Sequence, residues 1–181
     1  MRSGRVPNDL KIIITADKGG GKTTFIKSVA ELLAWHDIPH AGFYAEGSWD
    51  GNARSSFSLT LLPELTIMPL CDRTSEEWQS CGRFRYNPAA LEKGNEIIKR
   101  SGPDDIVLMD EIGRQELEGR VWAGALGIAM RMNNPLILSV QLRYLEGIIE
   151  MLKPLEFTVY NGSINPWPAI FNEVTANILS K

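Results

Sequence analysis

The sequence has few cysteines, and they are not arranged as a redox pair. Among 181 residues only Cys71 and Cys81 occur, and they do not form a C-x-x-C motif. Two cysteines are too few for the disulfide framework of a small secreted protein, so two ordinary thiols in the cytoplasm are expected. With His36 and His40 they could instead supply zinc ligands, although the four are not clustered as such ligands usually are.

A surplus of basic residues is also missing. Lysine and arginine number 19 against 22 aspartate and glutamate residues, which gives a formal net charge of -3. A protein that neutralises a row of nucleic-acid phosphates carries clustered positive charge, so no nucleic-acid partner is expected. No apolar run approaches the roughly 20 residues that span a bilayer, so no membrane partner is expected either.

The length and the hydrophobic content of 44% suit one full core. No internal repeat, low-complexity tract or linker divides the chain. The expectation is therefore a single domain over residues 1–181.

Short apolar, β-branched segments alternate with helical patterns along the chain. Strands are predicted at residues 11–15, 41–45, 105–110, 135–141 and 157–160. Helices are predicted at residues 22–36, 115–132, 144–152 and 167–179, and another from Pro88, with Asn87 as its N-cap, to a stop before Gly102. Residues 56–70, around Pro63, predict a β-hairpin.

This alternation predicts an α/β fold. Parallel strands need crossover connections, which place helices on both faces of the sheet. The expected architecture has three layers, α/β/α, around a mostly parallel sheet with a small β-hairpin insert. Ligands of such sheets lie beyond the carboxyl ends of the strands.

The segment A-D-K-G-G-G-K-T, which starts at Ala16, has the spacing of the phosphate loop G-x-x-x-x-G-K-[ST], with alanine for the first glycine. It lies between a predicted strand and a predicted helix, as the motif requires. An incidental glycine-rich turn is the alternative. Nucleotide-binding residues are then expected at Ala16, Asp17, Lys18, Gly19, Gly20, Gly21, Lys22, Thr23 and Thr24.

Each part of the loop has a role in phosphate chemistry. Successive glycine N–H groups approach phosphate oxygens, Lys22 bridges the β- and γ-phosphates, and Thr23 places its hydroxyl on Mg²⁺. The helix that follows directs its positive end at the same anion. A lysine at the second motif position marks partitioning ATPases; here that position is Asp17, so that class is not supported.

The segment I-V-L-M-D-E provides carboxylates at the end of another strand. Asp110 is predicted to hold Mg²⁺ through water as a Walker B aspartate, and Glu111 to orient and deprotonate the attacking water. This adjacency favours hydrolysis. The alternative is an acidic exit from a strand.

Several motifs together resemble the THEP-type nucleoside-triphosphatases, relatives of the cancer-related nucleoside-triphosphatase. They are A-G-F-Y-A-E from Ala41, C-G-R-F-R-Y-N-P-A-A-L-E-K-G from Cys81, and M-D-E-I-G-R-Q-E-L from Met109, which contains the family's D-E-I-G-x-x-E-L. The resemblance implies a RecA-like P-loop fold and slow, Mg²⁺-dependent hydrolysis of several nucleoside triphosphates. It also makes Glu46 a residue that could touch the metal's water shell or simply end a strand.

Other polar residues could complete the site. Arg114 is the third catalytic candidate, beside Glu111 and Lys22, because it could stabilise charge on the γ-phosphate. Arg143 could do the same and Gln141 could sense that phosphate; each arginine could equally be a surface residue.

Two other functions stay open. A P-loop nucleotide or small-metabolite kinase would need an acceptor pocket and an arginine-bearing lid, for which G-R-F-R around Arg83 and Arg85 is the candidate. A nucleotide-gated module would act on a protein partner that the sequence does not identify. In all three cases a nucleoside triphosphate is the expected ligand and Mg²⁺ the expected cofactor.

Overall fold

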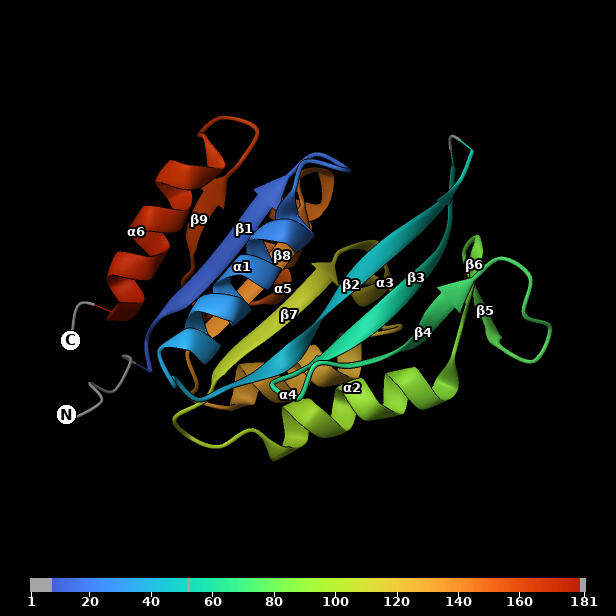
Figure 1. Ribbon diagram of the computed structural model, residues 1–181, viewed down its shortest axis with the longest axis horizontal. Helices are drawn as coiled ribbons and strands as arrows, with labels where there is room; N and C mark the ends of the chain where they lie inside the picture. The colour runs from blue at the N-terminus through green and yellow to red at the C-terminus, as the bar shows by residue number, and fades with distance from the viewer. Residues whose placement is uncertain (1–7, 52, 180–181) are drawn as a thin grey trace.

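The computed structural model describes residues 8–51 and 53–179, and a nine-stranded sheet runs through them (Figure 1). The strand order is β5-β6-β4-β3-β2-β7-β8-β1-β9. The strands are β1 (Lys11–Ala16), β2 (His40–Asp50), β3 (Ala53–Leu62), β4 (Thr66–Asp72), β5 (Gln79–Cys81), β6 (Phe84–Tyr86), β7 (Ile106–Ile112), β8 (Leu136–Gln141) and β9 (Thr158–Asn161).

One half of the sheet is parallel. Strands β2, β7, β8, β1 and β9 lie side by side in this order and pair with one another in parallel. These are the five strands that the apolar segments predict, so the parallel core is confirmed. Their carboxyl ends meet at one edge of the sheet, where the candidate site lies.

The other half is antiparallel and larger than the sequence indicates. The predicted hairpin exists as β3 and β4, but β2 also pairs antiparallel with β3, and β6 and β5 extend the sheet further. The expectation of a small hairpin insert is therefore wrong in size. Beyond Ala45, β2 is mostly exposed and polar, so no apolar run marks its continuation to Asp50.

Helices cover both faces of the sheet, which confirms the three-layer architecture. They are α1 (Lys22–Trp35), α2 (Pro88–Arg100), α3 (Arg114–Leu117), α4 (Ala123–Arg131), the 3₁₀ helix η1 (Leu142–Tyr144), α5 (Leu145–Met151) and α6 (Trp167–Leu179). Ile12 and Ile14 of β1 pack in the core with α1 and α6, whereas Ile13 lies in the core with α2, α4 and α5. In the part of the chain that the structure describes, no helix is long and apolar enough to cross a membrane.

The predicted helix over residues 115–132 is broken in two. Helix α3 ends at Leu117, and α4 begins at Ala123. Gly119 and Val121 have φ angles of 72° and 47°, which an α-helix does not allow. Leu117, at the end of α3, is 42% exposed. The apolar spacing is helical on both sides of the break and does not reveal the turn.

The predicted N-cap at Asn87 is confirmed and ties α2 to the sheet. Its side-chain oxygen accepts the N–H of Ala89 at 3.1 Å, and its amide donates to the carbonyl of Pro69 in β4 at 2.9 Å.

We expect Asn87→Ala to lower the free energy of unfolding by about 1–2 kcal/mol, measured by urea denaturation. Asn87→Asp keeps the cap oxygen and should lose less; equal losses would contradict a capping role.

Candidate functional site

The phosphate loop joins β1 to α1 and holds its lysine ready for an anion. Gly21 caps α1 with φ 89°, and a Cβ there would lie 2.8 Å from the ring nitrogen of Trp167. The Lys22 ammonium donates to the carbonyls of Ala16 and Asp17 at 3.1 and 2.9 Å. The side chain is buried, and desolvation lowers the pKa of Lys22. These carbonyls are neutral, so a bound phosphate would supply the negative charge that balances the Lys22 ammonium.

The start of α6 and the loop before it fix the phosphate loop in a way that sequence reasoning did not find. Trp167 donates its ring N–H to the carbonyl of Gly20 at 2.8 Å, and the Ser163 hydroxyl accepts the N–H of Asp17 at 3.2 Å. Trp167 also packs against Phe25 of α1. These partners are 146 and 147 residues apart in the chain, and no local motif indicates them.

Asp110 is a buried hydrogen-bond acceptor at the junction of four elements. Its carboxylate is 1% exposed and accepts the N–H of Ala45 in β2 at 3.1 Å. The hydroxyls of Ser139 in β8 and Thr23 in α1 also donate to it. Burial raises the pKa of Asp110, whereas these donors favour its ionised form.

The residues present fit a magnesium ion. Thr23 and Asp110 are a hydroxyl and a carboxylate in contact, the oxygen donors that Mg²⁺ takes beside nucleotide phosphates. Within residues 8–51 and 53–179 no three histidine, cysteine or acidic side chains are grouped as metal ligands. A metal here would therefore depend on phosphate oxygens and water for its remaining ligands.

Glu111 lies in a strained bulge that turns its side chain out of the sheet. The pairing of β7 with β8 shifts register between Met109 and Ile112, and Glu111 has φ 59°. Its N–H donates to the Ser139 hydroxyl at 3.1 Å. Such strain costs on the order of 1–3 kcal/mol and is commonest at functional sites. The Asp110 carboxylate is buried in the protein, whereas the Glu111 carboxylate on the bulge lines a cavity.

The pKa of Glu111 is raised by its surroundings. Its side chain reaches the cavity, but desolvation by the surrounding protein and the negative charge of Asp110 raise this pKa to about 7. The positive charge of Lys22 acts in the opposite direction. A carboxylate in this range is suited to accept a proton near neutral pH.

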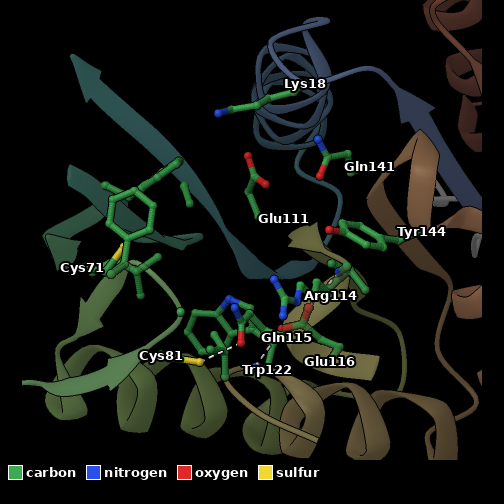
Figure 2. Close-up of a pocket in the computed structure, with 18 of the residues that line it drawn as sticks. Lys18, Cys71, Cys81, Glu111, Arg114, Gln115, Glu116, Trp122, Gln141 and Tyr144 are labelled. Carbon is green, nitrogen blue, oxygen red and sulfur yellow. Dashed lines mark hydrogen bonds between the residues drawn. The ribbon is translucent and has the colours of Figure 1, made fainter. Parts of the chain in front are cut away.

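Glu111 faces a cavity of about 480 Å³ that starts at the phosphate loop (Figure 2). Predicted residues on its wall are Lys18, Gly19, Lys22, Glu111 and Arg114, together with Gln141 and Arg143. Glu46 is not on this wall and pairs with Lys27 at 3.2 Å. Both cysteines also line the cavity as free thiols.

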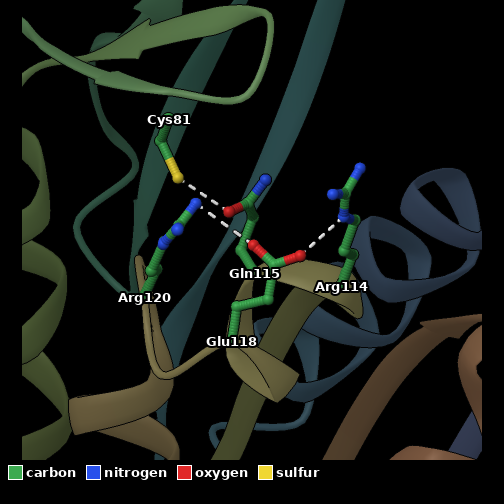
Figure 3. Close-up of polar contacts among 5 residues, drawn as sticks. All are labelled: Cys81, Arg114, Gln115, Glu118 and Arg120. Atoms are coloured by element: carbon green, nitrogen blue, oxygen red, sulfur yellow. Dashed lines mark hydrogen bonds and ion pairs between the residues drawn. The ribbon is translucent and has the colours of Figure 1, made fainter.

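Arg114 is on the cavity wall but is engaged by a carboxylate (Figure 3). Its Nε donates to Glu118 at 2.7 Å, and Arg120 pairs with the same carboxylate at 3.1 Å. Beside them the Cys81 thiol donates to the Gln115 side-chain oxygen at 2.7 Å. The catalytic role of Arg114 therefore stays a prediction that requires this ion pair to rearrange.

Arg54 is a cavity residue that sequence reasoning missed. Its guanidinium lies over the rings of Trp49 and Phe57, 5.0 and 5.2 Å from their centres. It also crosses Gly47, where a Cβ would be only 1.9 Å from an arginine nitrogen. The pairing of β2 with β3 brings Gly47 and Trp49 beside Arg54. A pattern along one strand could not reveal this arrangement.

The comparison with known proteins identifies the family. A family model described as NTPase matches residues 11–175. The chain belongs to the THEP1-type nucleoside-triphosphatase family. Membership places it among enzymes named for nucleoside-triphosphate hydrolysis.

Relatives named nucleoside-triphosphatase THEP1 occur in bacteria and archaea. The Thermotoga maritima protein is 35% identical over 61% of this chain, which aligns with 62% of that protein, less than two thirds of its length. The Metallosphaera sedula protein is 30% identical, over 74% of this chain and 72% of that protein. The Methanocaldococcus jannaschii protein is 25% identical, over 94% of this chain and 98% of that protein.

Two solved structures share the fold. A human cancer-related nucleoside triphosphatase superimposes with a TM-score of 0.72 at 20% identity, covering 95% of this chain and 98% of that one. THEP1 from Aquifex aeolicus gives a TM-score of 0.71 at 20% identity, covering 93% and 99%. At this identity the likeness establishes the fold alone.

The structure explains the last glutamate of the D-E-I-G-R-Q-E-L segment, Glu116. Glu116 is 3% exposed, and its two carboxylate oxygens accept the N–H groups of Gly113 at 2.7 Å and Trp122 at 3.1 Å. It thereby holds the turn after Glu111 and the break before α4. Glu116 is therefore a structural cap of the site, because each of its carboxylate oxygens already accepts a backbone N–H group.

Glu116 predicts a pH dependence of stability. Desolvation raises the pKa of Glu116 to about 7 from 4.5, so the folded protein binds this proton more tightly than the unfolded chain does. Its contribution to the free energy of unfolding therefore falls as pH rises from about 4.5 to 7, by up to roughly 3 kcal/mol at about 1.4 kcal/mol per unit. Urea denaturation at pH 5, 6, 7 and 8 should find a smaller decline in Glu116→Gln than in the wild type.

Glu118→Gln is the control for this experiment. The hydrogen bond from Arg114 lowers the pKa of Glu118, so that group titrates below the window. Its variant should keep the wild-type decline. An unchanged decline in Glu116→Gln would mean that Glu116 does not titrate as described.

Proposed function

We propose that this chain hydrolyses nucleoside 5′-triphosphates to the diphosphate and phosphate, with Mg²⁺, slowly and with little base discrimination. The observation that supports it is that an anion-binding lysine, a candidate base and a candidate metal site meet at one edge of the sheet. The lysine is Lys22 and the base is Glu111, which line one cavity. The metal site is the Thr23–Asp110 pair, which connects the phosphate loop to Walker B. The groups that meet there suit phosphates and a metal, which every nucleoside triphosphate presents.

In the proposed reaction each side chain has a separate task. The loop N–H groups and Lys22 hold the β- and γ-phosphates, and Thr23 and Asp110 hold Mg²⁺, which would neutralise charge on those phosphates. Glu111 orients a water toward the γ-phosphate and accepts its proton. The bulge at Glu111 and the position of its carboxylate on the cavity wall support this assignment.

We assign Arg54 a role in the same reaction. Its flat guanidinium is fixed by two aromatic rings, and among the described residues no carboxylate forms an ion pair with it. Its charge affects the pKa values of both Lys22 and Glu111. An arginine held in place near the γ-phosphate stabilises the charge that develops there during hydrolysis.

Phosphate release from ATP, GTP, CTP and UTP with Mg²⁺ tests the hydrolase. We expect slow release from all four, and Glu111→Gln should lower kcat by roughly 10²- to 10⁴-fold while it still binds MgATP. Lys22→Ala should instead weaken MgATP binding, measured by calorimetry. Near-normal turnover by Glu111→Gln would remove Glu111 from the reaction.

Arg54→Ala should lower kcat by roughly 10²-fold and change MgATP affinity less, because the contact strengthens with the developing charge. Gly47→Ala should lower kcat in the same direction, since its methyl group displaces the guanidinium. Arg73→Ala is the control: Arg73 also stacks on an aromatic ring, Phe84, but is not on the cavity wall. Equal effects of Arg54→Ala and Arg73→Ala would exclude the proposed contact.

Transfer of the γ-phosphoryl group to a small acceptor is the second candidate function. The observation that favours it is the extension of the cavity past Glu111 to Arg83, the arginine of G-R-F-R that a lid would need. Phosphate found on an added acceptor faster than in water would favour this function.

A further inference from the structure

The cavity extends well beyond the phosphate loop. Only Lys18, Gly19 and Lys22 on its wall belong to that loop. The remaining wall comes from β2 to β7, from residues 113–122 and from residues 141–144. Figure 2 places Lys18 and Glu111 in one part, and Cys81, Gln115 and Trp122 in another. We call the part lined by Leu70, Cys71, Cys81, Arg83, Phe84 and Trp122 the far chamber.

A bound triphosphate would leave the far chamber open. The γ-phosphate is expected between Lys22 and Walker B, and the other phosphates follow the loop N–H groups toward α1. Ser163 and Trp167 contact the loop, and neither residue lines the cavity. The far chamber therefore lies on the opposite side of the γ-phosphate from the rest of the nucleotide.

The cavity wall is strongly cationic. Among the described residues it has six basic side chains, Lys18, Lys22, Arg54, Arg83, Arg114 and Arg143, and two acidic ones, Glu111 and Glu116. Both oxygens of Glu116 already accept backbone N–H groups. Across the described ranges, no ion pair involves Arg83 or Arg143. Desolvation is the largest cause of the lowered pKa of Lys18. The positive charges of Arg83, Arg54 and Arg143 lower this pKa further.

The far chamber also has a neutral, apolar wall. Leu70, Phe84 and Trp122 are buried side chains on it, and Arg83 lies over the Phe84 ring at 5.2 Å. Burial raises the pKa of the Cys71 thiol to about 12, so it stays neutral at physiological pH. A wall of this kind accommodates an apolar or aromatic body, while unpaired arginines favour an anionic group.

We propose that the far chamber binds a second small molecule, an anion with an aromatic body, on the far side of the γ-phosphate. Its anionic group contacts Arg83, and its ring lies against Leu70 and Phe84. The whole cavity, including its phosphate-loop end, has a volume of about 480 Å³, and sites for small ligands occupy about 300–1,000 Å³. The position relative to the γ-phosphate rests on the proposed function, whereas the binding itself does not.

The test uses two matched probes and the two cysteines of the chain. The probe 8-anilinonaphthalene-1-sulfonate is an aromatic anion, and N-phenyl-1-naphthylamine is the same ring system without the sulfonate. Both cysteines line the cavity, so alkylation by N-ethylmaleimide, followed by mass spectrometry, reports its occupancy. The protein is first saturated with Mg²⁺ and a non-hydrolysable ATP analogue, which removes competition at the phosphate loop.

We expect the sulfonate probe to slow alkylation of Cys81 in the wild type, and Arg83→Ala to weaken its binding about tenfold. Arg85→Ala is the matched control, because Arg85 lies two residues away and is not on the cavity wall. The uncharged probe should bind the wild type and Arg83→Ala alike. Binding of the sulfonate without protection of Cys81, or equal binding by both arginine variants, would overturn the proposal.

Hydrolysis without a probe separates this proposal from the proposed function. Without the probe, the wild-type protein should release phosphate from MgATP. If no variant hydrolyses a triphosphate while the sulfonate probe still protects Cys81 through Arg83, the hydrolase proposal fails and the far chamber stands as a binding site.

Discussion

The buried carboxylate of Asp110 is the constraint on which the site depends. It takes hydrogen bonds from β2, β8 and the first turn of α1, so strands on both sides of β7 and the phosphate loop are fixed to one point. A carboxylate removed from water is costly unless such donors surround it. The same donors that make its burial tolerable therefore set the distance between the phosphate loop and Walker B.

A bulge next to Asp110 shapes the end of β7 at Glu111. With regular strand pairing β7 would continue in register with β8, whereas the observed shift and the positive φ of Glu111 send its carboxylate into the cavity. Glu116 then stabilises the following turn through two backbone N–H groups. A stabilising cap thus lies beside a strained residue, an arrangement in which the surrounding structure maintains the strain.

The charge of the whole chain conceals the charge of the cavity. A formal net charge of -3 argues against a nucleic-acid partner, yet six basic side chains meet around one space with two acidic ones. They come from the phosphate loop, β3, the β5–β6 hairpin and the segments after β7 and β8. These positive charges repel one another unless anions lie between them. Their arrangement therefore agrees with a bound triphosphate and with the second anion that we propose.

Local patterns predicted much of the fold. The five apolar segments are the five parallel strands, the N-cap at Asn87 opens α2 as expected, and Trp167–Leu179 is the last helix. The helix predicted over residues 115–132 was wrong because helical spacing persists across a turn at Gly119 that a buried glutamate stabilises. The antiparallel extension was underestimated because its strands are partly exposed and lack an apolar run.

For the site, the sequence by itself determined the phosphate loop and the Asp110–Glu111 pair, because spacing along one strand and one loop suffices to define them. Only the tertiary structure decided which other residues join them. Arg54, Trp167 and Ser163 approach through strand pairing and helix packing between segments far apart in the chain. The reason is physical: a cavity is formed by the edges of many elements, and no single element contains its pattern.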